Sequence, residues 1–452
     1  MDGLQNLPNE IRFYIQHLEK RITDLEGENK KLHEINQKLE AKLKQYENPH
    51  TPSSRQRFKG NSGGNVNPPG KRGAPIGHRG ATRQVPEPDE IIQVTADLCP
   101  RCGSFLGNPV GVESRTIEEL PQKQKIEVIR YDCYSYGCPS CGCEVTAVHP
   151  DCPQVGGLGV RLMTQITLVR FQLRGVLQRI QNFLDSCWNF RLSVTAVHDV
   201  LLRVGTAFQE PYEQLLWKIR TARFVYVDET GMRVLGQNWW LWVFRTDTND
   251  VLVVIRKSRG RDVLIEILGE GFTGAGVNDG WRVYKWLPVV QRCWAHLLRE
   301  VDEYKDASEH GRLLSEEMHI KFNRLKDFLG KDPPMEERQR QKEIWDKELQ
   351  LFVDEYIEYL DVQKVVKYIK NGLGCWYTCL LYPGMQPTNN LAEQTIREHV
   401  IMEKIIGTFR SIKGPENYQY ISSLLATWKL QGKNIAEETE NLLRRKLCLS
   451  GA

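Results

Sequence analysis

Apolar residues in the amino-terminal segment, residues 8–47, recur in alternating steps of three and four. This spacing gathers them on one side of a helix and predicts a coiled coil. The apolar side of the helix forms the seam along which two helices would pair. Asn29 and Asn36 occupy seam positions, where a pair of polar residues favours a two-helix coiled coil in fixed register. We expect a homodimer, the alternative being a single amphipathic helix packed on its own domain. The seam consists of Ile11, Ile15, Leu18, Ile22, Leu25, Leu32, Leu39, Leu43 and Tyr46.

Residues 48–86 lose this pattern and are rich in Gly, Pro, Ser, Asn and basic residues, with no acidic residue. Such a composition predicts a disordered linker. Its positive charge suits salt-sensitive contact with DNA phosphates, and a solubilising spacer is the equal alternative. Arg72 and Arg79 are the candidate DNA contacts within the basic set, which comprises Arg55, Arg57, Lys59, Lys71, Arg72, Arg79 and Arg83.

Residues 87–155 hold two Cys-Pro-x-Cys-Gly sequences, one with Cys99 and Cys102 and the other with Cys138 and Cys141, and 35 residues lie between Cys102 and Cys138. Both sulfurs of such a pair reach one zinc ion at about 2.3 Å, and the following Gly permits a tight turn. Four thiolates leave zinc no open position, so one structural Zn²⁺ is expected. Three nearby cysteines leave the second pair's ligands open: Cys133, Cys143 and Cys152.

Helical spacing of apolar residues returns in residues 156–220, in the runs 158–171 and 173–184 and in a third run from residue 192. Ser193 suits the N-cap of the third helix. Three short helices resemble a helix-turn-helix DNA-binding module, and a plain packing module is as good an interpretation. In a DNA-binding module the third helix would present Thr195, His198 and Arg203.

Residues 221–430 begin with β-branched and aromatic runs at 223–234, 239–245 and 251–255, separated by turn residues. These runs predict an antiparallel meander. A helix over 261–268 and a strand ending at Asn278 follow. The order of these elements predicts a ribonuclease H-like α/β domain with a strand beside the first one.

Asp228 falls inside the first of these strands, and Asp279 follows the fourth. A carboxylate within an apolar strand is costly unless it is paired, exposed or bound to a cation. If the two strands are neighbours, both carboxylates face one spot, and oxygen ligands of this kind suit magnesium or manganese. We therefore predict a metal site that includes these two aspartates.

Glu393 is the third candidate acid, in the first turns of a helix that Thr388 or Asn389 would cap. Arg397 lies one turn later, where it could hold a phosphate or Glu393 itself. Glu398 is the alternative acid, and helical spacing places it on a different face.

Between Asp279 and Glu393 the charged stretch from about 300 to 370 predicts a helical insertion, and residues 431–452 predict a helical tail. The insertion could help to hold DNA or act as a structural lid. Arg299, beside it, is a candidate phosphate contact. His296, near Cys293, is another candidate phosphate contact, with a satisfied core residue as the equal alternative, and we expect no zinc site there.

Several of these segments resemble the DDE transposases of the insertion-sequence-66 type, in that family's order along nearly the whole chain. The resemblance implies that Asp228, Asp279 and Glu393 bind two Mg²⁺ or Mn²⁺ ions, roughly 4 Å apart in a two-metal mechanism. It also implies double-stranded DNA with terminal inverted repeats as substrate, and accessory proteins of the same element as possible partners. The segments are 70–79, the two Cys pairs, Val227-Asp-Glu-Thr-Gly231, 278–284, 292–299, Asn389-Asn-Leu-Ala-Glu393 and 407–411.

The sequence thus predicts a multidomain α+β transposase that cuts and joins DNA. A ribonuclease H-like nuclease without joining activity, or an inactive dimeric DNA-binding relative, is the alternative. The net charge of +4 is too small to identify a DNA-binding protein alone, and the 12 cysteines fit metal ligands and buried thiols better than disulfides. With no apolar run of about 20 residues, no membrane partner is expected, and the predicted location is the nucleoid of a prokaryotic cytoplasm.

Overall fold

The computed structural model describes residues 20–23, 25–27, 29–32, 36, 87–115, 117 and 126–449. The described residues of the amino-terminal segment are helical, and three seam residues among them are exposed: Ile22, Leu25 and Leu32. The rest of the predicted coiled coil and the whole basic linker, with Arg72 and Arg79, lie outside the described residues. Pairing of two chains therefore stays a prediction. Residues 1–120 and 121–452 form separate compact units.

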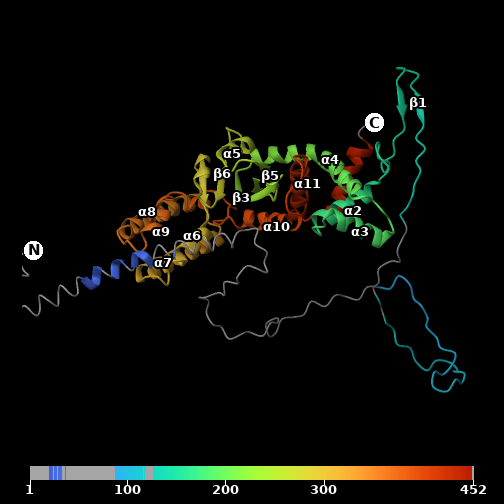
Figure 1. The fold of residues 1–452 in the computed structure, drawn as a ribbon, viewed down its shortest axis with the longest axis horizontal. Helices are drawn as coiled ribbons and strands as arrows, with labels where there is room; N and C mark the ends of the chain where they lie inside the picture. The colour runs from blue at the N-terminus through green and yellow to red at the C-terminus, as the bar shows by residue number, and fades with distance from the viewer. Residues whose placement is uncertain are drawn as a thin grey trace, which may run out of the picture. The chain divides into compact units, whose positions relative to one another are not determined.

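Three helices follow the cysteine-rich region, as the sequence predicted: α2 (Val160–Phe171), α3 (Leu177–Trp188) and α4 (Val194–Arg220). Ser193 caps α4, because its side chain accepts a hydrogen bond from the Ala196 N–H at 3.0 Å. The third helix is much longer than a recognition helix needs, and it leads directly into the sheet (Figure 1).

The sheet has five strands in the order β5-β4-β3-β6-β7. Strands β3 (Phe224–Val234), β4 (Gln237–Thr246) and β5 (Val251–Arg256) form the predicted antiparallel meander. Strand β6 (Ala275–Asn278) lies parallel to β3, and β7 (Val289–Arg292) lies parallel to β6. This order and these directions are consistent with a ribonuclease H-like domain. A short hairpin, β1 (Ser135–Gly137) with β2 (Glu144–Thr146), lies outside this sheet.

The β3–β4 turn is tighter than the sequence predicted. Leu235 and Gly236 have φ angles of 51° and 75°, and Val234 already pairs with Gln237. A two-residue turn with both φ angles positive matches the twist of a hairpin. Strand β4 therefore begins at Gln237, inside the segment expected to form the turn.

Alternate side chains of β3 enter different cores, as the two-residue period of a strand requires. Val225 and Val227 pack with α4, α5 (Arg261–Leu268) and α11 (Lys413–Leu430). Phe224 and Tyr226 belong to a second core, which the helical insertion shares. By this alternation Asp228 faces the insertion side of the sheet, and Glu229 faces the other.

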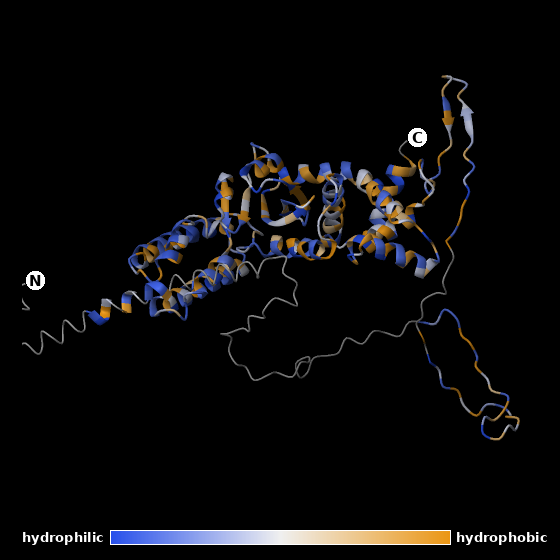
Figure 2. Cartoon of the chain, viewed as in Figure 1, coloured by the Kyte–Doolittle hydropathy of each residue, from blue (hydrophilic) through white to orange (hydrophobic). Residues whose placement is uncertain are grey.

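The insertion contains the helix-rich stretch that the sequence predicted. Its helices are α6 (Trp294–Asp302), α7 (Glu309–Gly330), α8 (Met335–Tyr356) and α9 (Gln363–Lys370). They extend away from the end of the sheet that α2 and α3 approach (Figure 1). Figure 2 shows hydrophilic and hydrophobic residues mixed along these helices, and the apolar ones supply the second core.

Helices α10 (Asn390–Ile406), α11 and α12 (Ile435–Leu443) complete this unit. Helix α11 covers the edge strand β5, whose outward N–H groups would otherwise be free to pair with another chain. Its polar side chains, spaced one turn apart, accept these N–H groups: Gln419 from Ile255 at 3.1 Å, Ser423 from Val253 at 2.8 Å and Thr427 from Val251 at 2.9 Å. Within the described residues, no helix has both the length and the apolar character that crossing a bilayer demands.

Candidate metal centre of three acids

The parallel register of β3 and β6 brings Asp228 and Asp279 together. Phe224 lies opposite Ala275 and Tyr226 opposite Val277. Continuing this register by two residues places Asp228 beside Asp279, both half-buried. The Asp279 side chain accepts a hydrogen bond from the Trp281 N–H at 2.8 Å, which holds the turn after β6. The predicted convergence of the two aspartates therefore follows from strand pairing alone.

Asn389 ties the start of α10 to the same strand. Its side-chain amide donates to the Val227 carbonyl at 2.9 Å, one residue before Asp228. Its backbone N–H contacts the Cys293 sulfur at 3.1 Å. Asn389 stands at the N-cap position, but its side chain makes no capping bond. The predicted capping role was therefore wrong, and the residue instead anchors the helix that carries Glu393 beside the two aspartates.

Asp228 lies in a cluster of negative charge. Burial, together with the nearby carboxylates of Glu229, Asp279 and Glu393, raises the pKa of Asp228 to about 7. A group of acids that disfavours its own ionisation is what a divalent cation would stabilise, and carboxylate oxygens are the donors that Mg²⁺ and Mn²⁺ prefer. The residues present therefore fit the magnesium site that the sequence implied.

This shift in the Asp228 pKa predicts how stability depends on pH. The metal-free folded protein keeps the Asp228 proton up to pH about 7, whereas the unfolded chain releases it near 3.8. Ionisation between these values therefore costs folding stability, and a cation bound to the ionised form restores it. We expect Mg²⁺ to raise the melting temperature more at about pH 8 than at about pH 6. An equal rise at both pH values, or the same rise in Asp228→Asn, would contradict this.

The anchoring role of Asn389 makes a second prediction. Asn389→Ala should raise the Mg²⁺ concentration needed for half-maximal activity by about 10-fold, the low end of the cost of losing support around a metal ligand, because its amide fixes the helix that carries Glu393 and bonds to a backbone carbonyl. Asn390→Ala is the matched control, because that neighbouring side chain is exposed. A titration of activity against Mg²⁺ measures the effect. A fall in melting temperature with no change in the Mg²⁺ requirement would show that Asn389 serves folding only.

Glu229 supports the site from the other face of β3. Its buried carboxylate accepts two hydrogen bonds from Arg259, at 2.8 and 3.1 Å, and one from the Tyr284 hydroxyl. The Arg259 guanidinium lies between the rings of Trp240 and Trp281, at 4.4 and 4.1 Å from their centroids. Sequence reasoning did not identify this cluster. Its one signal was a second acid directly after Asp228, which strand alternation sends to the opposite face.

The basic residues around Glu393 differ from expectation. An Arg299 guanidinium nitrogen lies 3.4 Å from Glu393 Oε1, and Arg299 is exposed. Arg397, expected on this face, is exposed on α10 and is not the cation beside Glu393. Arg292, at the end of β7, is buried with its guanidinium over the rings of Tyr368 and Trp376.

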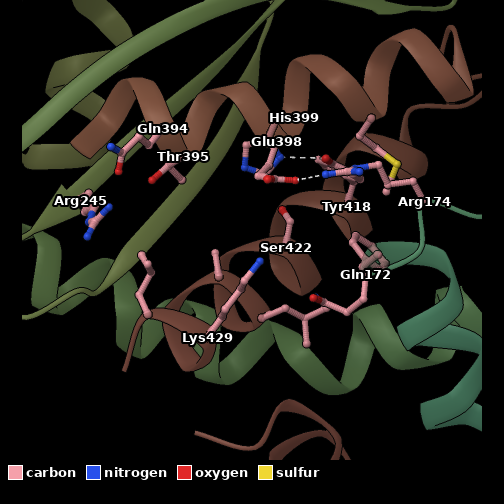
Figure 3. Close-up of a pocket in the computed structure, with 15 residues that line it drawn as sticks. Gln172, Arg174, Arg245, Gln394, Thr395, Glu398, His399, Tyr418, Ser422 and Lys429 are labelled. Atoms are coloured by element: carbon pink, nitrogen blue, oxygen red, sulfur yellow. Dashed lines mark hydrogen bonds and ion pairs between the residues drawn. The ribbon is translucent and has the colours of Figure 1, made fainter. Parts of the chain in front are cut away.

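Glu398 faces away from these acids, as its helical spacing predicted. It pairs with Arg174 in a cavity of about 280 Å³, which the three candidate acids do not line. Figure 3 shows Glu398 with Arg174, and His399 with Tyr418, whose ring nitrogen and hydroxyl are 2.8 Å apart. Burial lowers the pKa of His399 to about 4. Glu398 is thus engaged by Arg174 in a solvent-exposed ion pair, and Glu393 stays the predicted metal-binding acid of α10.

Each Cys-Pro-x-Cys-Gly sequence forms the same turn. The Gly103 N–H donates to the Cys99 carbonyl at 2.8 Å, and Gly142 donates to Cys138 at 2.9 Å. Both glycines have a φ of 73°, in the left-handed region. Hydrogen bonds, chiefly from Ser104, lower the pKa of the exposed Cys102 thiol. Hydrogen bonds, chiefly from Cys143, likewise lower the pKa of the Cys141 thiol. The two sequences thus share one turn geometry, and Cys138 and Cys141 as the second pair of zinc ligands stay a prediction.

The residues expected to face DNA from α4 have mixed positions. Thr195 is exposed and His198 is half-buried. Arg203 donates a hydrogen bond to the Val155 carbonyl, so its guanidinium is partly engaged within the protein. The helical trio also shares its apolar core with the sheet.

The strand order places two aspartates side by side, and α10 brings Glu393 next to them. These features are those of an enzyme of the DDE class, which is named for two aspartates and a glutamate. The chain matches the family model described as Transposase IS66 family over residues 156–417, more than half its length. Residues 96–142 match the zinc-finger binding domain of transposase IS66. The chain therefore belongs to the IS66 family of DDE transposases. A search of curated proteins finds no match.

Proposed function

We propose that this transposase cuts DNA at the terminal inverted repeats of its insertion sequence and joins the freed ends to target DNA. The observation that carries the proposal is the convergence of Asp228, Asp279 and Glu393, from β3, the end of β6 and α10. The three acids come from three elements and meet where β6 ends beside β3, and a group of carboxylates of this kind suits hard cations.

The acids act by holding cations in place. When bound, two Mg²⁺ or Mn²⁺ ions supply the activation of a water or DNA 3′-hydroxyl and the stabilisation of the leaving oxygen at phosphorus. Asp228 and Asp279 offer carboxylate oxygens from the sheet, and Glu393 offers one from the helix that Asn389 fixes. No serine, cysteine or histidine nucleophile is needed, so one site serves both cleavage and joining.

Basic residues are the proposed phosphate contacts. Arg299 is exposed beside Glu393. Its guanidinium could bind a DNA phosphate in place of the Glu393 carboxylate. Arg397 lies exposed on the same helix as Glu393. Arg72 and Arg79 belong to the basic linker and would add contacts that do not depend on sequence.

The remaining parts of the proposal concern assembly. One zinc ion held by Cys99, Cys102, Cys138 and Cys141 would fold the zinc-finger domain. The amino-terminal coiled coil would join two chains and so bring two DNA ends together. Accessory proteins of the same element are possible further partners, and the site of action would be the nucleoid of a prokaryotic cell.

The test is strand cleavage and joining by the full chain on labelled DNA that carries the element's own ends, in Mg²⁺ or Mn²⁺. We expect both cleaved and joined products from those ends and neither from scrambled ends. Cleavage without joining would establish a nuclease. End-specific binding without either reaction, in both metals, would establish a DNA-binding relative.

A further inference from the structure

A second potential metal site shares Glu393. The Cys293 sulfur, a ring nitrogen of His296 and a Glu393 carboxylate oxygen all lie within 4.8 Å of one another. Cys293 precedes α6, His296 lies in its first turn, and Glu393 comes from α10. From the sequence we expected no zinc site at Cys293 and His296, and the third residue of the group lies 97 positions beyond His296.

Cys293 is held in place, whereas a buried nitrogen of His296 lacks a hydrogen-bond partner within the part of the chain that the structure describes. Cys293 is fully buried, its N–H donates to the Asn278 carbonyl at 2.9 Å, and its sulfur accepts the Asn389 N–H. His296 Nδ1 is buried and, among the described residues, has no hydrogen-bond partner. It lies 3.6 Å from Glu393 Oε1. A buried nitrogen without a partner is costly, and a cation between these three groups would satisfy it.

The donors differ in kind from those of the magnesium site. A thiolate, an imidazole and a carboxylate form a ligand set for Zn²⁺, which accepts sulfur, nitrogen and oxygen and tolerates one open position. Mg²⁺ takes oxygen ligands. The two sites therefore select different ions, and Glu393 cannot serve both fully at the same time.

We propose that Cys293, His296 and Glu393 bind Zn²⁺, and that the bound zinc withdraws Glu393 from the magnesium site and inhibits the transposase. Binding converts the Cys293 thiol to a thiolate and releases its proton to solvent. The inhibitory half of this inference rests on the proposed function of Glu393. Binding itself does not, and the two halves are tested separately.

Binding is tested on the full chain with Co²⁺, a spectroscopic substitute for zinc, after the zinc-finger cysteines have been filled with zinc. Wild type should gain a thiolate-to-cobalt charge-transfer absorption that Cys293→Ser lacks. Cys375→Ser is the matched control, a half-buried thiol outside the cluster. Asp228→Asn should keep the absorption, because Asp228 belongs only to the magnesium site. Absence of the band in wild type, or its persistence in Cys293→Ser, would overturn the proposal.

Inhibition is tested by titrating Zn²⁺ into the Mg²⁺-supported cleavage reaction. With each protein compared to its own rate in Mg²⁺ alone, Cys293→Ser should need at least about tenfold more zinc than wild type for half inhibition, since losing even an outer-shell partner weakens metal binding by about 10- to 100-fold. Equal zinc sensitivity of both proteins would refute the inhibitory role. If no cleavage is found in any condition, the proposed function fails, whereas the cobalt result still decides the binding site.

Discussion

Asp228→Asn is expected to lose metal-dependent strand cleavage by on the order of 10³-fold, because a displaced cation forfeits several kcal/mol of transition-state stabilisation. The substitution keeps the shape of the side chain and removes one charge from a crowded acidic cluster. The metal-free variant should therefore melt at the same temperature as wild type or higher. Single-turnover cleavage rates and thermal unfolding in the absence of divalent metal measure the two effects.

Glu398→Gln is the control for this prediction. It removes an acid from the helix that carries Glu393, but from the face turned toward Arg174. We expect its cleavage rate to stay close to wild type. If Asp228→Asn cleaves normally, or loses activity only in step with a lower melting temperature, Asp228 is a structural residue.

Removal of zinc is expected to unfold the zinc-finger region and leave the sheet domain folded. Structural zinc contributes about 10–16 kcal/mol to the folding of small zinc fingers. Among the described residues of this region large apolar side chains are mostly exposed, including Val94 at 91%, Phe105 at 87% and Val110 at 107%, and form no apolar core that could replace the metal. Hydrogen exchange of Cys102→Ser, or of wild type with a chelator, should show lost protection within residues 96–142.

The matched substitution for this experiment is Cys187→Ser, a half-buried thiol on α3. It should leave exchange within residues 96–142 unchanged. Full protection of that segment in Cys102→Ser would show that Cys102 is no zinc ligand. Lost protection throughout the sheet as well would show that zinc supports the whole chain.

Strong local patterns made much of the fold predictable. The β-branched and aromatic runs located β3 to β5, and a carboxylate within an apolar strand marked Asp228 as a residue that needed a partner. Strand β7 was missed because its four residues follow a Pro and carry no alternation. Because β7 was not predicted, the sequence did not indicate that Cys293 lies between β7 and α6.

Contacts between distant segments could not be predicted from local sequence patterns. Nothing local to Asn389 indicates that its amide reaches Val227, 162 positions away, instead of capping α10. Arg259 and Tyr284 meet Glu229 only because β3 presents alternate side chains to opposite faces. The choice between Arg299 and Arg397 as the cation beside Glu393 likewise depends on how α6 packs against α10, which no local pattern specifies.

The most direct test of the three-acid site is a crystal of the full chain soaked in Mn²⁺, with the metal located by anomalous scattering. We predict manganese bound between the carboxylates of Asp228, Asp279 and Glu393, and none there in Asp228→Asn. Manganese bound elsewhere in a protein that cleaves its DNA ends, with this site empty, would contradict the assignment of these acids.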